Sequence, residues 1–439
     1  MSAALLASAV DALRLDRQKS AFGQALRSLR SFSAAEWRSG LRVLDRTGIT
    51  LPLYARLCEN GDRAALPGVV PEVVIDALER RRRDNQRRME GMLQTFGQAV
   101  RALQHARIPF VCLKGFSLFP EYFVQLWRRH QVDFDFLVAP WDAARARAVL
   151  EALGYQLSGS AGDKELRLRI PVQEHMDRDA YMYDRQQGSS IELHTSFWDP
   201  GSFDLPLRCP EDALERAEMH VVGDVVFARL SQPHAFVYQV LHVFRHFLGS
   251  WARPLWIYEI AFFIHRHRDR DELWRDVREL IAVDLRMADA AALVLFLANA
   301  LFGPAVPASL AGLCCRPEQD PIRLWVEHFA WRWAVADMPG NKLNLLLHRH
   351  FIADRLEWRN YLTSRLLPFA GNAALCEGLE ESAAGLWRYK LANLRYRAQR
   401  ALHHVHADLE FGFASISWNA AQHFRPGRAP GGAITRSAT

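Results

Sequence analysis

The chain has 439 residues, of which 50% are hydrophobic and 24% are charged. A chain of this length and composition can bury a large core and should form two or three domains, which excludes an intrinsically disordered protein. The 55 basic and 49 acidic residues leave a net charge of only +6, and this small excess does not by itself indicate binding to nucleic acid.

The N-terminus lacks the basic start of a signal peptide, and the most apolar stretch, residues 290–302, is shorter than the ~20 residues of a membrane helix. None of the six cysteines has the spacing of a zinc knuckle or a redox motif. We therefore expect a cytoplasmic protein with reduced cysteines in its core and no membrane partner.

Residues 1–105 are predicted to form an N-terminal helical region. Ser33 should cap a helix, because Glu36 stands three residues later and can reach back to the backbone N–H of the cap. Gly48 should end that helix.

A longer helix is predicted over residues 71–105. It carries an apolar stripe at spacings of four and three, formed by Met89, Leu93, Phe96, Val100 and Leu103. The basic run at residues 80–88 is interpreted as a solvated face, since it lacks the interleaved aromatic residues of a nucleic-acid site.

The next stretch, residues 108–138, is predicted to form a strand, a turn, a helix and a second strand. Residues 108–113 are apolar, and Lys114 and Gly115 interrupt them where a buried strand would hand over to a helix. We expect that helix to run to about Arg128.

The second strand carries two carboxylates. Because side chains alternate along a strand, Asp133 and Asp135 should share one face, roughly 7 Å apart, while Phe134 and Phe136 take the other. A strand over residues 190–197 could lie beside it and direct Glu192 into the same space. Three acids in this arrangement suit shared divalent metal ions and phosphoryl chemistry.

The remaining pattern completes an α+β fold. We expect residues 106–225 to form a core with a small mixed sheet and helices on one side, including a helix over residues 143–153. Residues 226–425 should form a C-terminal helical domain, and residues 426–439 a disordered tail.

Three motifs carry a resemblance to a known family: Val-Cys-Leu-Lys-Gly at 111–115, Arg-His-Gln-Val-Asp-Phe-Asp-Phe-Leu-Val at 129–138 and Ile-Glu-Leu-His at 191–194. In order and spacing they resemble the uncharacterised nucleotidyltransferase family of the polymerase-beta-like superfamily. The flanks are similar more weakly, through Trp37, Gly48 and a later pair of histidines. The resemblance implies a nucleotidyltransferase core set between helical regions.

It also implies roles for the acids. Asp133, Asp135 and Glu192 would be catalytic and would bind Mg²⁺ or Mn²⁺, with Glu192 helping to deprotonate the acceptor hydroxyl. The plainer alternative is that an acid-apolar-acid strand is simply an exposed sheet face.

The resemblance implies a nucleotide site beside the acids. Its expected residues are Lys114, Gly115, Ser117 and Arg129. Gly115 would allow close approach of phosphate to the backbone, and the two cations would meet the phosphate oxygens. The alternatives are that Lys114 is a surface cation and that Arg129 is a structural partner of a carboxylate.

Four further residues are assigned to the acceptor site or to the support of the acids: His194, His242, His246 and Glu259. His194 could orient Glu192 or cap its strand. His242 and His246 lie four apart on one side of a predicted helix and should meet polar partners facing the acids. Zinc binding by this pair, with Glu259 as third ligand, is the alternative.

The sequence thus predicts transfer of a nucleoside monophosphate from an NTP, with ATP the first expectation, and release of pyrophosphate. The acceptor would be a small molecule, peptide or protein, and no nucleic-acid partner is expected. Two alternatives stay open: an inactive nucleotide-binding or scaffold protein with the same fold, and a phosphotransferase that uses the same acids.

Overall fold

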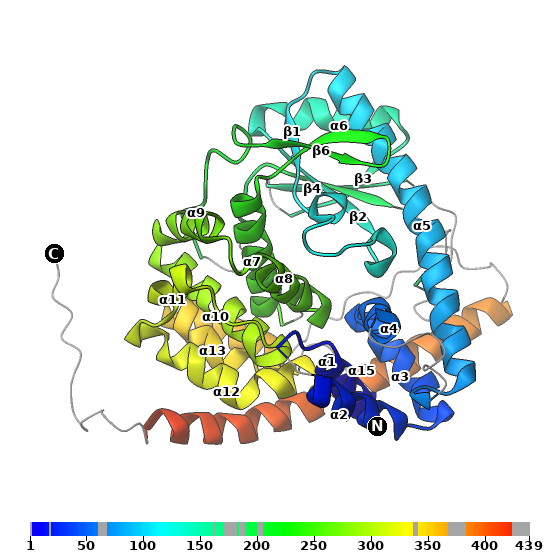
Figure 1. Ribbon diagram of the computed structural model, residues 1–439, viewed down its shortest axis with the longest axis vertical. Coiled ribbons are helices and arrows are strands. Elements are labelled where there is room, and N and C mark those ends of the chain that lie inside the picture. The colour runs from blue at the N-terminus through cyan, green and yellow to red at the C-terminus, as the bar shows by residue number, and fades with distance from the viewer. Residues whose placement is uncertain are drawn as a thin grey trace.

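A computed structural model describes most of the chain. The described residues are 2–16, 19–59, 68–161, 164–170, 182–183, 189–199, 205–250, 252–336, 341–367 and 383–423. A mixed sheet and two helices occupy one end of the molecule, and helices from both ends of the chain occupy the other (Figure 1). This arrangement confirms the predicted α+β class.

The N-terminal helices are α1 Ser2–Ala12, α2 Lys19–Arg30, α3 Ala34–Thr47, α4 Thr50–Glu59 and α5 Glu72–His105. The predicted capping box begins α3, where the Ser33 N–H donates to Glu36 Oε2 at 2.8 Å. Gly48 ends this helix with a positive φ of 81°, a left-handed conformation that glycine adopts without steric cost. The long helix predicted over residues 71–105 is confirmed as α5.

Seven strands form the sheet: β1 Phe110–Cys112, β2 Asp133–Val138, β3 Gln156–Ala161, β4 Glu165–Arg169, β5 Ser190–His194, β6 Glu218–Val222 and β7 Val225–Arg229. Their order is β3-β4-β5-β2-β1-β7-β6. β2 pairs in parallel with β5 and antiparallel with β1, so the sheet is mixed, as predicted.

One face of the sheet is apolar and packs against α5 and α6 (Ala143–Ala152). Phe96 of α5 is central to it, with ring centroids 5.4 Å from Phe134, 5.8 Å from Phe136 and 4.9 Å from Phe227. The second half of α5 therefore packs as part of the sheet layer, although the sequence assigned it to the N-terminal helical region.

The opposite face of the sheet meets the C-terminal helices. These are α7 Gln232–Leu248, α8 Pro254–His267, α9 Asp271–Ala282, α10 Leu285–Phe302, α11 Ala308–Cys314, α12 Asp320–Ala334, α13 Leu345–Phe351, α14 Arg355–Leu366 and α15 Ala383–His423. Gln239 of α7 donates to the carbonyl oxygen of Leu113 at 3.3 Å, and Arg245 pairs with Glu165 of β4 at 3.2 Å. The prediction of helices on one side only is therefore wrong.

The prediction of a helix that runs to about Arg128 is also wrong. Only short 3₁₀ turns form there, at Gly115–Leu118 and Leu126–Arg128. Pro120 lies between them, and a proline has no N–H for a helical hydrogen bond and disfavours helix in the residue before it. Tyr122 and Phe123 instead pack into the core shared with the C-terminal helices.

The basic run on α5 is only partly solvated. Arg81 and Arg88 are buried together with Asn85, because these positions continue the buried stripe of Val74, Leu78 and Met92. Arg81 pairs with Asp45 at 2.9 Å. The interpretation of the whole run as a solvated face is therefore wrong at these positions.

Helix α10 extends the apolar stretch of residues 290–302 to 18 residues, long and apolar enough to cross a membrane by length and composition. However, 67% of it is buried, among α7, α8, α9 and α12. Burial of this kind is typical of the central helix of a helical domain.

The cysteines follow the core prediction in part. Cys112 and Cys314 are buried, Cys58 and Cys209 are partly buried, and Cys315 is exposed, which contradicts the prediction for Cys315. Cys376 and the tail predicted over residues 426–439 lie outside the described residues. The three expected domain boundaries stay predictions.

Candidate active site

The acids lie where two parallel strands pair. The register of β2 and β5 sets Asp135 opposite Glu192 and Leu137 opposite His194, so these side chains leave one face of the sheet. Among the described residues, ligand atoms of Asp135, Glu192 and His194 all lie within 4.8 Å of one another. This group can hold a metal ion, and His194 stands in it where the sequence led us to expect Asp133.

Asp135 is the most buried of the acids, with 2% of its surface exposed. Its Oδ1 accepts hydrogen bonds from Lys114 Nζ at 2.8 Å and His194 Nε2 at 3.2 Å. Burial alone would raise the pKa of Asp135, but the Lys114 charge and the His194 hydrogen bond outweigh it and hold that pKa well below its usual value. The second oxygen, Oδ2, is buried without a hydrogen-bond partner.

Lys114 is the cation of this site. Its ammonium group is buried, which would lower its pKa, but the charges of Asp135 and Asp133 raise that pKa above its usual value. Lys114 therefore stays charged and balances the acids. The alternative of a surface cation is wrong.

Glu192 is partly buried, and its carboxylate contacts Arg167 of β4 through Oε1 at 3.0 Å. Its Oε2 lies 3.8 Å from His194 Nε2. Burial, followed by the negative charge of Asp135, raises the pKa of Glu192 to about 7. Two close carboxylates thus differ in their hold on a proton, because Lys114 lies against Asp135, whereas burial and the charge of Asp135 outweigh the cations near Glu192.

Asp133 is half-buried at the start of β2, opposite Ser190. The charge of Asp133 acts on Arg88 of α5, but the pKa of Arg88 falls to about 10 because burial outweighs that attraction. Arg88 also donates to the carbonyl oxygen of Gln131, and Asn85 donates to those of Trp127 and Arg129 at 2.8 and 3.0 Å. The polar stripe of α5 thus holds the backbone that leads into β2.

The turn after β1 is built around Gly115, whose φ is 72°. A Cβ atom there would lie 2.9 Å from Gln131 Oε1, so the close approach of Gln131 also requires glycine. Ser117 is buried, and its hydroxyl donates to the carbonyl oxygen of Lys114 at 3.2 Å. Only a 3₁₀ turn follows Gly115, so no α-helix N-terminus is available to phosphate at this turn.

Arg129 and Glu259 form a buried ion pair, with Nε 2.8 Å from Oε1. Arg129 Nη1 also donates to Gln131 Oε1 at 3.3 Å, so the pair is linked to the side chain that covers Gly115. The alternative in which Arg129 is the structural partner of a carboxylate is therefore confirmed as a contact, and that carboxylate is Glu259. Glu259 is not placed as a zinc ligand.

His242 and His246 pack against each other and against Trp256 of α8, with centroid distances of 4.6, 4.8 and 4.4 Å. Burial, then the charge of Lys114, lowers the pKa of His242 well below its usual value, so this ring is neutral and lies within electrostatic range of Lys114. Within the described part of the chain, neither histidine joins a group of metal ligands.

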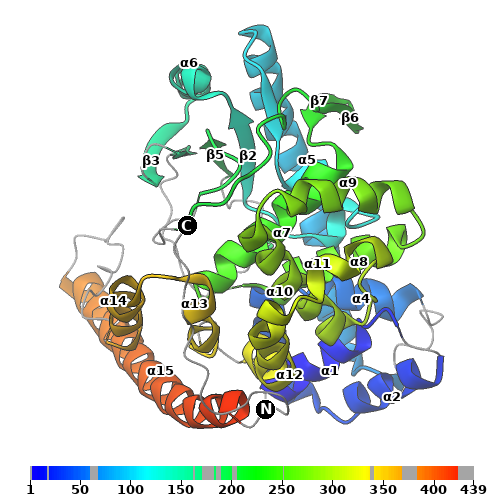
Figure 2. The same ribbon diagram turned by 90° about the vertical axis from the view of Figure 1, so that its left-hand side faces the viewer.

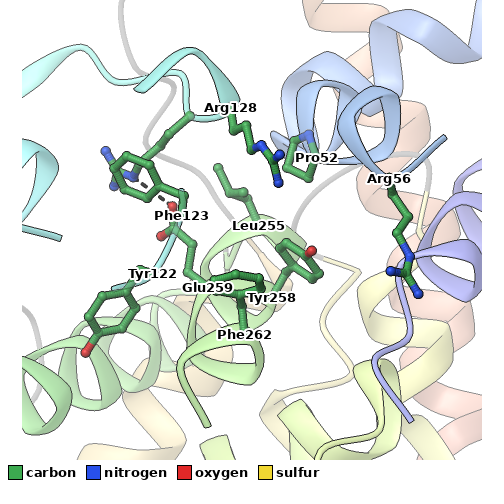
Figure 3. A pocket seen from close by; sticks show the side chains of 10 residues that line it. Pro52, Arg56, Tyr122, Phe123, Arg128, Leu255, Tyr258, Glu259 and Phe262 are labelled. Atoms are coloured by element: carbon green, nitrogen blue, oxygen red, sulfur yellow. Dashed lines mark hydrogen bonds and ion pairs between the residues drawn. The ribbon is translucent and has the colours of Figure 1, made fainter. Parts of the chain in front are cut away.

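A small cavity lies beside this site, between α4, α8 and the segment after β1 (Figure 3). Pro52, Arg128, Leu255 and Tyr258 are among its lining residues, and the three acids are not. Its volume of about 20 Å³ holds roughly one or two water molecules, so it is too small for a nucleotide.

The sequence analysis missed three residues near the acids: Arg167, Tyr238 and Arg88. Arg167 alternates with Leu166 and Leu168 in β4, a period-two pattern that assigns it to one face. Tyr238 precedes His242 by one helical turn, and burial raises its pKa, as does the charge of Asp135. Arg88 continues the α5 stripe. In each case the periodicity of the sequence shows which residues share a face of the helix or strand, but it does not show that this face is directed toward the acids.

Comparison with known proteins agrees with this geometry. The sequence model of a family described as uncharacterised nucleotidyltransferase matches residues 33–303, from the cap of α3 to the end of α10. No curated protein and no solved structure matched the chain. The matched residues exceed half of the chain and include every acid of the site, so the chain belongs to the uncharacterised nucleotidyltransferase family.

Proposed function

We propose that the protein transfers a nucleoside monophosphate from an NTP, ATP in the first instance, to an acceptor hydroxyl or phosphate, with release of pyrophosphate. The observation that carries this proposal is the register of β2 and β5, which sets Asp135 opposite Glu192 with Asp133 two residues along the same face. The family match supports the general reaction class.

The donor set fits a divalent cation. Asp135 Oδ2 is buried without a partner, and a buried carboxylate oxygen in this state is costly unless a ligand satisfies it. Asp133, Asp135 and Glu192 would hold Mg²⁺ or Mn²⁺, since carboxylate oxygens suit these ions. When bound, the ion would neutralise charge on the phosphates as pyrophosphate leaves.

The residues of the chain would do the rest. In the reaction the acceptor oxygen bonds to the α-phosphorus, and the bond from that phosphorus to the oxygen bridging the β-phosphate breaks. Glu192 would take the proton of an acceptor hydroxyl, and His194 would orient Asp135 through its hydrogen bond. Lys114 would add a positive charge beside the phosphates.

One observation favours the inactive alternative. Lys114 already occupies Asp135 Oδ1, so the chain supplies its own cation to the acids. A nucleotide-binding or scaffold protein with this pair would be stable without a metal ion. Turnover therefore requires that a metal ion bind the acids while Lys114 remains in contact with Asp135.

The test uses two labels on each of the four NTPs, incubated with the purified protein, Mg²⁺ and a host extract. Nucleotidyl transfer moves label from the α-phosphate to an acceptor and releases pyrophosphate. Label moving only from the γ-phosphate, with release of a nucleoside diphosphate, would identify the phosphotransferase. Nucleotide binding without movement of either label would identify the inactive protein. An Asp133→Asn preparation controls for contaminating enzymes.

A further inference from the structure

The last described helix, α15, lies far from the acids and outside the residues that match the family. It has 41 residues and runs along the edge of the molecule farthest from the sheet (Figures 1 and 2). Its C-terminal half is held to the protein by the buried Ala407, Ala414 and Trp418, and the Trp418 ring lies 6.0 Å from Phe329 of α12. This edge is therefore an attached part of the fold.

The outward side of α15 carries a stripe of large apolar residues. Each is more than half exposed: Trp387, Leu391, Leu394, Leu402, Val405, Leu409, Phe413 and Ile416. At 100° per residue all eight fall within roughly 100° of arc, opposite the three buried residues. We call this set the α15 stripe. It is about 45 Å long at 1.5 Å per residue.

The exposed charge beside the α15 stripe is positive. Lys390 and Arg397 flank it on one side and Arg395 on the other, and all three are exposed. The acids of the helix, Asp408 and Glu410, instead form ion pairs with Lys342 and Arg332 on neighbouring parts of the protein. The helix therefore presents apolar side chains between cations.

Three physical arguments decide what such a surface fits. The α15 stripe stays on one side of a straight helix with 3.6 residues per turn. A left-handed coiled coil with a second copy would instead require apolar residues every 3.5 positions, and such a series would move gradually around a straight helix. Two copies packed in parallel would also bring Lys390, Arg395 and Arg397 against the same cations of the second copy. Six of its eight members are aliphatic, whereas single-stranded nucleic acid stacks on aromatic rings.

We propose that the α15 stripe binds a membrane surface that contains anionic lipids. The apolar side chains would enter the boundary between head groups and acyl chains, and Lys390, Arg395 and Arg397 would contact lipid phosphates or carboxylates. Because the sheet lies at the opposite end of the molecule from α15, the strands that carry the acids would lie away from the membrane surface. This binding would overturn the expectation of no membrane partner, and it does not depend on the proposed function.

The experiment is flotation of the full chain with phosphatidylcholine vesicles, with and without phosphatidylserine, at low and high salt. Wild type should float with the anionic vesicles and be released by salt, because part of the attraction is electrostatic. Val405→Glu removes one stripe contact and should weaken binding about 10-fold or more. Gln399→Glu adds the same charge at an exposed position off the stripe and should weaken binding far less.

Thermal melting of both variants checks the fold, and both should melt as wild type does because positions 399 and 405 are exposed. Failure of wild type to float with anionic vesicles at low salt would overturn the proposal. So would equal binding by Val405→Glu and wild type. A concentration-dependent dimer that Val405→Glu dissociates, without vesicle binding, would identify a second copy as the occupant instead.

Discussion

The two faces of β2 show how one strand serves two purposes. Phe134 and Phe136 point to a face where aromatic rings from α5 and neighbouring strands pack around Phe96. Asp133 and Asp135 alternate with them and point to a face with Lys114, Glu192 and His194. Both faces are largely buried, but the first is stabilised by apolar contacts, whereas the charged groups of the second depend on charge balance.

This difference teaches where stability and chemistry reside. The apolar face gains free energy from burial in proportion to its area. The polar face must offset the desolvation of each charge with a partner, and Asp135 Oδ2 lacks one. The apolar face should therefore dominate the free energy of folding, and the acid face should dominate activity and metal dependence.

The largest expected effect is on catalysis by Asp133→Asn. Asp133 is half-buried and is not part of the Lys114–Asp135 ion pair, so its loss should leave the melting temperature within a few degrees of wild type. Loss of one anionic ligand should lower nucleotidyl transfer by about 1,000-fold. Steady-state assays with Mg²⁺ and thermal melting measure both. Near-normal turnover would remove Asp133 from the metal site.

The matching change on the other face is Phe136→Ala. Phe136 has no exposed surface and stacks on Phe96, so the cavity left behind should lower the free energy of unfolding by about 3–5 kcal/mol. Trp141→Ala is the control, because that ring is 81% exposed and should cost little. Urea unfolding of both variants makes the measurement. If Phe136→Ala unfolded at the wild-type midpoint, the contrast between the two faces would fail.

Local periodicity made much of this comparison predictable. The alternation in β2, the acid-apolar-histidine strand of β5 and the stripe of α5 each depend on side chains a few residues apart. The capping box of Ser33 and Glu36 is equally local, and the structure has it. The sequence could also place β5 beside β2 as a possibility, because both motifs are short apolar strands with an acid at matching positions.

The partners of each charge could not be predicted in the same way. Arg129 pairs with Glu259, 130 positions away, because α8 packs beside the turn after β1. Arg88 is a charged residue at a position that continues an apolar stripe. Its charge indicated an exposed position, whereas its spacing indicated a buried one. The helix expected to run to Arg128 does not form because Pro120 interrupts it, and Tyr122 and Phe123 pack into the core with helices distant in sequence.

A change at Lys114 should separate charge balance from metal binding. Lys114→Met keeps the length of the side chain but leaves Asp135 buried without its ion pair, which should cost about 3–5 kcal/mol in a metal-free buffer. Mg²⁺ or Mn²⁺ should then stabilise this variant by about 2.7 kcal/mol at 100 times its Kd, and wild type by less at the same concentration.

Thermal melting with a chelator and with increasing metal concentration measures this difference. Asp135→Asn/Lys114→Met is the matched control, because it removes both charges and should lose the metal response. An equal rise in melting temperature for wild type, Lys114→Met and the double variant would mean that the ion binds elsewhere.

The smallest expected effect concerns Arg167, which was not among the predicted site residues. Its guanidinium group lies 3.0 Å from Glu192 Oε1 and 2.9 Å from Glu165 Oε1, so it positions Glu192 from the edge of the acid face. Arg169 lies two residues along the same strand, is exposed and faces the same side. Arg167→Gln should lower turnover about 10-fold, in the range for residues that orient a metal ligand, whereas Arg169→Gln should stay near wild type.

The pH profile of turnover adds a readout that a purely structural role would not change. Loss of a neighbouring cation raises the pKa of Glu192, so the acidic limb of the profile should move to higher pH in Arg167→Gln alone. Equal turnover and equal pH profiles in the two variants would show that Arg167 does not act through Glu192, and the contrast between the faces would then depend on Lys114, Asp133, Asp135 and His194.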